Sequence, residues 1–226
     1  MHKLIAFEDM TLISESKSSQ RRATCVALGR IAHVGFRQPE LVKTIIPDLI
    51  GYLSDSNSEV CSRACWAFGQ IGLQRPKWVQ IAVPRLTQLI EHPEARVREE
   101  AIWALGCIGR AQPEIVKSYL DRIWQKANDE EPQVRLAVIR ACENIAAQRP
   151  EWFANAIPLF AELLDDPDTR YVRREAPEIL RIIGKRRPDL VRCAAPKLIE
   201  KLTDPDSVVR MHAQGALNVI QRPKAD

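Results

Sequence analysis

The sequence lacks a long apolar run and a strong excess of charge of one sign. Nowhere do 18 apolar residues follow one another, as a membrane-spanning helix would need. The N-terminal stretch MHKLIAFEDM includes acidic side chains and no apolar core, so no signal peptide is predicted either. The 33 basic and 29 acidic side chains leave a net charge of +4, a bias too small to indicate nucleic-acid binding by itself.

Paired cysteines are also missing. The six cysteines are scattered without a CxxC motif, which argues against a disulfide framework and a zinc ribbon and favours a reducing, cytoplasmic environment. Cys61 and Cys65 share one helix face, but no third and fourth ligand accompanies them. We therefore expect buried or incidental cysteines rather than a metal site, and no cofactor.

Sequence-readable catalytic motifs are absent as well. The chain has no glycine-rich phosphate loop, no GxSxG and no HExxH. Hydrophobic residues make up 46% and charged residues 27%, as in ordinary globular proteins that fold without a partner. These features favour a folded protein without enzymatic activity.

What the sequence does contain is an internal repeat. The segment RACWAFGQIGLQRP returns 37 residues later as EAIWALGCIGRAQP. A valine recurs at spacings of 37, 37, 38 and 37 residues, and a proline at 37, 37, 37 and 38. The repeated positions are Val60, Val97, Val134, Val172 and Val209, and Pro39, Pro76, Pro113, Pro150 and Pro188. Such a period predicts stacked units, none of which buries its apolar face alone.

Each unit is predicted to consist of two helices joined by a polar turn. The first helix follows the repeated proline and contains an internal proline, which should kink it or mark a new first turn. The internal prolines are Pro47, Pro84, Pro158 and Pro196. The second helix begins near the repeated valine and turns one apolar arc toward its partner helix. Its expected ends are Gly72, Gly109, Ala146 and Gly184, and the arc of the second unit is Val60, Ala64, Ala67, Phe68 and Ile71.

The pattern D-x-x-x-x-V-R-x-x-A-x-x-A-L-G, from about Gln20 to Ile220, resembles HEAT repeats. The resemblance implies an all-α fold, a right-handed α-solenoid of about six helical hairpins in one domain. The expected units are 1–37, 38–74, 75–111, 112–148, 149–186 and 187–226. The first unit is degenerate, as a terminal cap would be, and the last apolar face either meets a partner chain or stays modestly exposed.

In HEAT repeats, an aspartate in the turn and an arginine after the valine form a stacking ladder. The resemblance implies this role for Asp129 with Arg135, Asp166 with Arg173, and Asp204 with Arg210. The second unit departs from the pattern with Cys61 at the arginine position, and the third with His92 at the aspartate position. Arg98 is left to reach a carboxylate of a neighbouring unit.

Two tryptophans stand apart from the repeated pattern. Trp66 and Trp103 lie about 140° from the centre of the apolar arc on a helical wheel, and the second helices of this fold line its concave surface. Neighbouring second helices lie roughly 10 Å apart, so Trp66, Trp103 and Arg140 would form a ladder there. The flanking candidates are Gln70, Glu99, Asn144, Arg174, Glu178 and Arg181. The alternative is that each ring packs sideways against the adjacent unit, whereas Trp78 and Trp152 are expected in the core.

The HEAT resemblance implies a non-enzymatic interaction module that binds a protein or peptide on its concave face. A basic cluster in the fifth unit leaves open a nucleic-acid binder or a DNA-glycosylase-like protein, against a solvated face with local ion pairs. The cluster is Arg170, Arg173, Arg174, Arg181, Lys185, Arg186, Arg187, Arg192 and Lys197. A third alternative, by analogy, is a lyase-type helper for a chromophore or cofactor. The acidic turns lack calcium-loop spacing and are expected to cap helices.

Overall fold

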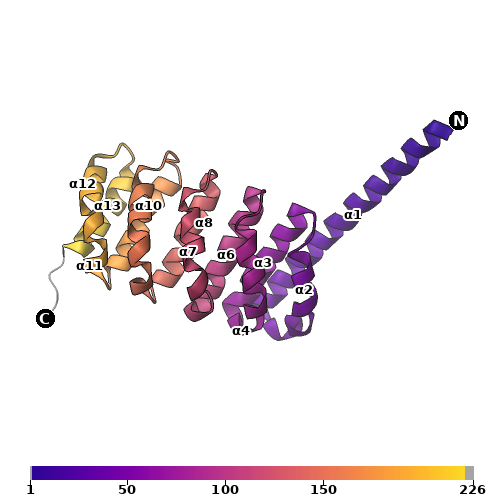
Figure 1. Ribbon diagram of the computed structural model, residues 1–226, viewed down its shortest axis with the longest axis horizontal. Helices are drawn as coiled ribbons and strands as arrows, with labels where there is room; N and C mark the ends of the chain where they lie inside the picture. The colour runs from indigo at the N-terminus through magenta and orange to yellow at the C-terminus, as the bar shows by residue number, and fades with distance from the viewer. Residues whose placement is uncertain (1, 222–226) are drawn as a thin grey trace.

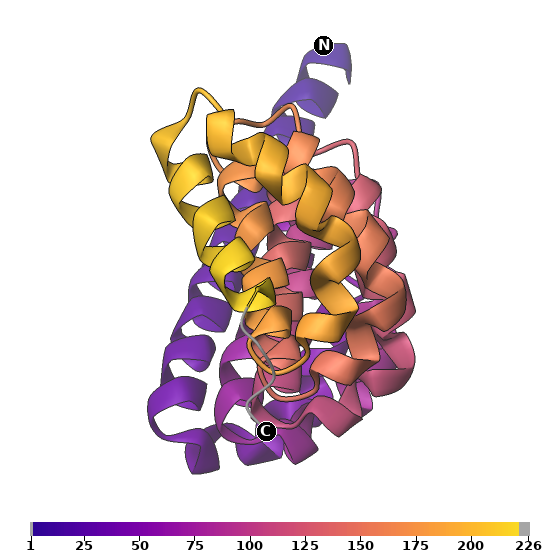
Figure 2. The same cartoon turned by 90° about the vertical axis from the view of Figure 1, so that its left-hand side faces the viewer.

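A computed structural model describes the backbone of residues 2–221 and the side chains of residues 18–221. Helices follow one another in a single row, from α1 (His2–Arg37) to α13 (Ser207–Ile220), and residues 2–221 contain no strand (Figure 1). Turned by 90°, the row is seen nearly along its length, so that successive units overlap (Figure 2). The predicted α-solenoid class is confirmed.

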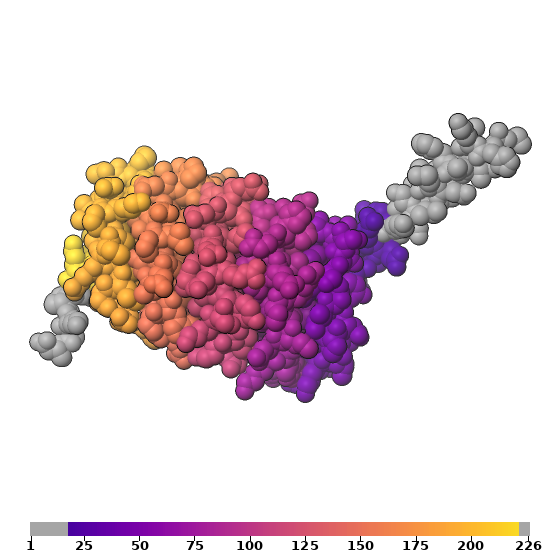
Figure 3. All heavy atoms as spheres, in the orientation of Figure 1, coloured from indigo at the N-terminus to yellow at the C-terminus, as the bar shows by residue number. Residues whose placement is uncertain are grey.

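The second helices form one continuous layer. They are α3 (Ser58–Gln74), α6 (Ala95–Ala111), α8 (Pro132–Ala146), α10 (Val172–Gly184) and α13. Each packs on the one before it, beginning with α3 on α1. Their side chains opposite the first helices make up what we call the second-helix face. In the space-filling view, the units follow one another as consecutive bands of colour (Figure 3).

The first helices are divided into short segments. In four units an α-helix begins one residue before the internal proline, so this proline opens a new first turn as predicted. The segments of the second and third units are η1 (Pro39–Ile45), α2 (Ile46–Tyr52), α4 (Pro76–Val79), η2 (Gln80–Ala82) and α5 (Val83–Leu89). Those of the fourth are η3 (Pro113–Ile115), η4 (Lys117–Tyr119), α7 (Leu120–Gln125) and η5 (Lys126–Asn128). The last two units have η6 (Pro150–Ala156), α9 (Ile157–Glu162), η7 (Leu163–Asp165), α11 (Pro188–Val191), η8 (Arg192–Ala194), α12 (Ala195–Glu200) and η9 (Lys201–Thr203).

The first unit differs from the other five. A hairpin was expected there, but α1 runs without interruption through SESKSSQ, the segment aligned with the polar turns. No proline or glycine occurs between residues 2 and 28, and no Asp-Pro or Asn-containing turn sequence breaks the helix. Five hairpins therefore stack on a single long helix, which projects beyond the row at its N-terminal end (Figure 1).

The apolar arc predicted for the second helices forms the core. Val60, Ala64 and Phe68 of α3 are all buried, as are the equivalent side chains of the following helices. Glycine lets the second helices approach closely: a Cβ on Gly106 would lie 2.7 Å from the Cα of Ala141 on the next helix. Small residues therefore have two roles: alanines form part of the apolar stripe, and glycines allow a short distance between the second helices of adjacent units.

The expected helix ends at Gly72 and Gly109 were wrong by two residues, because α3 and α6 continue to Gln74 and Ala111. Neither glycine adopts a positive φ, so neither acts as a left-handed cap. Their role is packing. Side chains of the next unit, Ile108 and Ile145, occupy the space that a Cβ at each glycine would need.

One turn asparagine and two turn aspartates accept from N–H groups at the starts of three second helices, whereas α6 and α8 have no side-chain cap. The side chain of Asn57 accepts from the backbone N–H groups of Glu59 and Val60, both at 3.1 Å. Asp168 and Asp206 accept in the same way at the starts of α10 and α13. These oxygens saturate helix N–H groups that have no partner within the helix.

The arginine–aspartate ladder connects units rather than closing within one. Arg135 donates to the carboxylate of Asp166 in the next unit at 2.7 and 2.8 Å, and its remaining nitrogen donates to the backbone carbonyl of Asp129 in its own turn. Arg173 pairs with Asp204 at 3.5 Å in the same sense. The within-unit partners inferred from the sequence are therefore corrected by one unit, since the guanidinium lies across the gap between adjacent turns.

No helix among the described residues is long and apolar enough to cross a membrane. At the C-terminal end of the row, Ile199 and Met211 are 54% and 61% exposed. The last unit thus has apolar side chains on its surface in the single chain.

Candidate binding site on the second-helix face

Trp66 and Trp103 both pack sideways onto the preceding unit. The ring of Trp66 meets His33 of α1 edge to face, with centroids 5.7 Å apart and planes at 84°. Trp103 lies over Gly69 of α3, which has no Cβ to obstruct the ring. Both tryptophans remain half-buried, so sideways packing accounts for only part of each ring. The rest faces open space on the second-helix face.

Three adjoining pockets follow this face from α3 to the start of α10. The first, about 280 Å³, lies between Trp66 and Arg140, and the second, about 300 Å³, shares Trp103 and Arg140 with it. The third, about 310 Å³, shares Arg140 with both and reaches Tyr171. We call the three together the central groove. Its other lining residues are Glu99, Glu100, Gln133, Leu136, Ala137, Ala141, Glu143, Asn144, Pro132 and Asp168.

The sequence-predicted site residues divide into two groups. Those that line the central groove are Trp66, Trp103, Arg140, Glu99 and Asn144. The others do not line it: Gln70, Arg174, Glu178 and Arg181. Arg174 pairs with Asp206 of the next unit at 2.6 Å, and Arg181 pairs with Glu178 on its own helix. Their charges are thus largely satisfied within the protein.

Two carboxylates beside Trp103 escaped the sequence interpretation. Burial raises the pKa of Glu100 to about 7, and the neighbouring Glu99 adds to the shift. Burial likewise raises the pKa of Glu143 to about 8, with Glu175 and Glu178 on α10 adding to it. The 37-residue period could have drawn attention to both residues, because each differs from its equivalent one unit earlier. Glu100 is equivalent to Arg63, and Glu143 is equivalent to Gly106.

Glu143 has the unsatisfied buried oxygen of the groove. Its Oε1 atom is buried and has no hydrogen-bond partner among the described residues. Glu99 and Glu175 nearby form no ion pair with any described residue, and Arg140 is the basic side chain of the groove that lacks one. Unpaired carboxylates therefore outnumber unpaired cations around Trp103, and a buried unpaired oxygen is costly unless a ligand donates to it.

The basic cluster of the fifth unit is mostly paired. Arg173, Arg174, Arg181, Arg187 and Lys197 each contact a carboxylate, and Arg170 stacks on Tyr171. Lys185, Arg186 and Arg192 are left without an ion pair among the described residues. This arrangement matches the solvated face with local ion pairs that the sequence left as one alternative.

Trp78 and Trp152 are less buried than the core position expected for them. Each ring packs on the core with one face and holds two cations at its other surfaces. Lys43 and Arg75 lie 5.0 and 5.6 Å from the centroid of Trp78, and Lys117 and Arg149 lie 4.9 and 5.7 Å from that of Trp152. The alkyl stems and charged groups of these lysines and arginines thus cover the parts of the two indole rings that the core does not bury.

The cysteines are free among the described residues. Cys61 and Cys65 are both buried in α3, and Cys61 Sγ contacts the carbonyl oxygen of Leu53 at 3.5 Å. No three potential metal ligands gather anywhere in the part of the chain that the structure describes. The two thiols serve as small core side chains.

Two family models match the chain. The model for the adaptin N terminal region matches residues 3–166, and the model for HEAT repeats matches residues 120–218. No curated protein shows significant sequence similarity to the chain. The fold and these matches define an α-solenoid of helical-hairpin repeats, a class of protein-binding scaffold.

Among the solved structures that are similar to the chain are designed and engineered proteins. A designed armadillo repeat protein in complex with the peptide (KR)4 has a TM-score of 0.72 and 21% identity, covering 86% of this chain and 92% of its own. An engineered protein has a TM-score of 0.72 and 25% identity, and the match covers 90% of this chain and 93% of the engineered one. A second engineered protein has a TM-score of 0.71 and 23% identity, and the match covers 90% of each chain. The chain belongs to the HEAT-repeat family, and the adaptin N terminal region matches the larger part of it.

Proposed function

We propose that the protein is a non-enzymatic interaction module whose concave, second-helix face holds an extended protein or peptide segment. Trp66, Trp103 and Arg140 form the centre of this surface. The segment carries lysine or arginine side chains, which enter the central groove beside Trp103. The observation that carries the proposal is the buried, unpartnered carboxylate oxygen of Glu143 next to an open aromatic ring.

The chemistry of the groove suits a cation on an alkyl stem. The ammonium or guanidinium group can donate to Glu143 and to the unpaired Glu99, and the stem can lie against the indole of Trp103. Such a ligand removes the cost of the unpaired buried oxygen, which an apolar side chain would leave in place. Tryptophan and arginine are also the residues that most often dominate binding energies at interfaces.

The designed armadillo protein of the same fold binds an alternating lysine–arginine peptide, which agrees with this reading of the groove. The nucleic-acid alternative is not favoured, because ion pairs within the protein occupy five of the nine basic side chains of the fifth unit. Nothing in the groove favours the chromophore-lyase alternative.

The test is the affinity of a fluorescein-labelled (KR)4 peptide, followed by fluorescence anisotropy. We expect the native protein to bind it and the Trp66→Ala, Trp103→Ala double variant to lose it, since each ring contributes on the order of 2 kcal/mol, about thirtyfold in affinity. Each ring should contribute less than this to folding, because neither tryptophan is fully buried.

The matched control removes the two tryptophans at the other edge. The Trp78→Ala, Trp152→Ala variant deletes the same number of rings outside the groove and should retain the peptide. An alternating Asp–Glu peptide should bind to neither protein through the groove. Failure of native protein to bind the basic peptide, or equal loss in both double variants, contradicts the proposal.

A further inference from the structure

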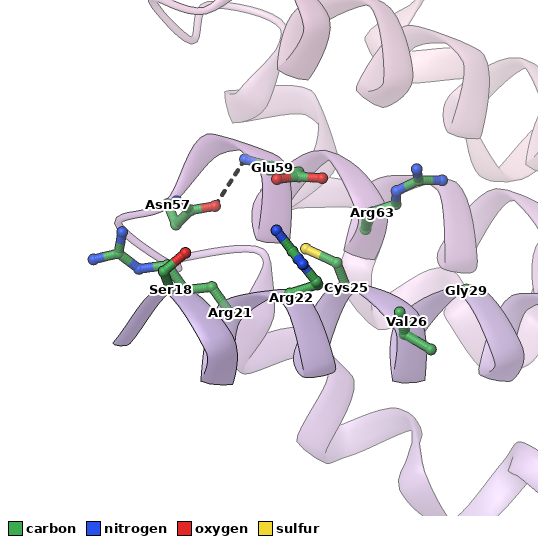
Figure 4. A pocket seen from close by; sticks show the side chains of 9 residues that line it. All are labelled: Ser18, Arg21, Arg22, Cys25, Val26, Gly29, Asn57, Glu59 and Arg63. Atoms are coloured by element: carbon green, nitrogen blue, oxygen red, sulfur yellow. Dashed lines mark hydrogen bonds between the residues drawn. The ribbon is translucent and has the colours of Figure 1, made fainter. Parts of the chain in front are cut away.

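A fourth pocket, of about 550 Å³, opens on the second-helix face between α1 and α3, one unit before the central groove. We call it the N-terminal pocket. Figure 4 shows that α1 supplies Arg21, Arg22 and Cys25 to it, and that α3 and its preceding turn supply Asn57, Glu59 and Arg63. None of its arginines was among the binding residues expected from the sequence.

The pocket exists because the first unit has a glycine at the position where the second and third units have a tryptophan. Gly29 stands 37 residues before Trp66, which itself stands 37 residues before Trp103. A Cβ built on Gly29 would meet no atom within 4 Å. The position that an indole ring occupies in the next two units is therefore open here, and it is large enough to admit side chains of a ligand.

The N-terminal pocket is lined mainly by guanidinium groups, whereas carboxyl groups surround Trp103 in the central groove. Arg21, Arg22 and Arg63 form no ion pair with a described residue, although Glu59 lines the same pocket. Other second-helix arginines, Arg98, Arg135 and Arg174, have carboxylate partners. The N-terminal pocket thus has a net positive charge that no ion pair with a described residue neutralises.

The placement of the three guanidinium groups indicates the shape of the anion. Arg21 and Arg63 extend toward opposite ends of the pocket, and Arg22 lies between them (Figure 4). Groups that converge on one point would suit a single phosphate, whereas groups spread along a pocket suit several carboxylates of an extended chain.

We infer that the N-terminal pocket binds an acidic segment of the same peptide whose basic residues occupy the central groove. The inference rests on the proposed function, and it adds a charge pattern to the partner. Carboxylates of the peptide pair with Arg22 and Arg63, and Lys or Arg side chains pair with the carboxylates around Trp103.

The fold also sets the spacing between the two charged parts. From α1 to α6 there are two helix-to-helix steps, each roughly 10 Å. An extended peptide advances about 3.3 Å per residue, so roughly six residues separate its acidic part from its basic part. Acidic and basic residues placed side by side would not reach both sites.

The experiment is a double-mutant cycle between protein and peptide. The probe is a labelled peptide with two glutamates, six Gly or Ser residues and two Lys–Arg pairs, made in both chain directions, and the tighter-binding direction is used. Its counterpart has glutamine in place of both glutamates. We expect native protein to prefer the glutamate peptide by about tenfold and the Arg22→Ser, Arg63→Ser variant to bind the two peptides equally.

The control variant, Arg122→Ser with Arg192→Ser, removes the same charge from the first-helix side and should keep the native preference. A third peptide, with the glutamates directly beside the basic residues, should bind native protein no more tightly than the glutamine peptide does. The inference is overturned if native protein binds the glutamate and glutamine peptides equally while the Trp66→Ala, Trp103→Ala variant still loses both. Loss of neither peptide in that tryptophan variant contradicts the proposed function instead.

Discussion

Arg98 donates two hydrogen bonds to the carboxylate of Asp129, at 2.9 and 2.7 Å, across 31 residues of sequence and from one repeat to the next. Both side chains are nearly inaccessible, at 7% and 4% exposure. The same arginine donates to the carbonyl oxygens of His92 and Pro93, which belong to the turn of its own unit. One guanidinium thereby holds two successive turns together, and Arg135 with Asp166 repeats the arrangement one unit on.

Asp166→Asn should destabilise the protein by about 3 kcal/mol, because it leaves the buried Arg135 guanidinium without a counter-charge. Asparagine retains a side-chain oxygen for the N–H of Asp168, so the turn itself is preserved. Urea unfolding measures the change. Glu114→Gln is the control, since it breaks an ion pair between units whose partners are 42% and 50% exposed, and the midpoint should stay unchanged. Equal effects of the two changes would show that the ladder adds nothing beyond an exposed pair.

Gly106→Ala should destabilise by roughly 1–3 kcal/mol, because its Cβ would lie 2.7 Å from backbone and side-chain atoms of Ala141. The two second helices would have to separate. Gly51→Ala is the matched change at a helical glycine with nothing within 4 Å, and it should stabilise by about 0.5–1 kcal/mol. Thermal unfolding of both variants gives the sign directly, and a stabilised Gly106→Ala protein contradicts the close contact.

Stability should fall between about pH 4.5 and pH 8. The pKa values of Glu100 and Glu143 are raised to about 7 and about 8, so the folded state holds these protons more tightly than the unfolded chain, where such groups titrate near 4.5. Their contribution is complete below the unfolded value and is lost as pH rises through the folded values. The combined loss amounts to several kcal/mol, because a pKa difference of one between the two states corresponds to about 1.4 kcal/mol.

Glu143→Gln isolates the larger part of this effect. The carboxylate faces Glu175 and Glu178, which raise its pKa, and Arg140 and Arg181, which lower it. Glutamine cannot ionise, so the variant should gain stability relative to native protein as pH rises from about 4.5 to about 8. Urea unfolding at several pH values measures the difference, and parallel pH profiles would contradict the raised pKa of Glu143.

Duplex DNA should bind weakly and without a contribution from the fifth unit. Changing Lys185, Arg186 and Arg192 together to serine removes the three basic side chains of the cluster that have neither an ion pair nor an aromatic contact with a described residue. We expect native protein and this variant to show similar anisotropy with a labelled duplex, and both to release it between about 50 and 200 mM salt. Tight binding that persists at the higher salt and disappears in the variant would favour the nucleic-acid alternative.

Much of the architecture follows from the sequence alone. The 37-residue period, the valine and alanine stripe and the internal prolines predicted the hairpins, the buried arc and the new first turns, because each depends on local geometry repeated from unit to unit. Trp66, Trp103 and Arg140 were also placed on one face by helical periodicity, and they line adjoining pockets. Local patterns suffice for features that one helix or one hairpin decides.

Only the tertiary structure decided what happens between units. Whether Asp129 pairs with Arg135 or with Arg98 depends on the offset of adjacent turns, which no single unit contains. The pocket over Gly29 and the raised pKa of Glu143 likewise arise from neighbours that are distant in sequence. Burial and charge are properties of the assembled stack, because each side chain takes its surroundings from two or three helices at once.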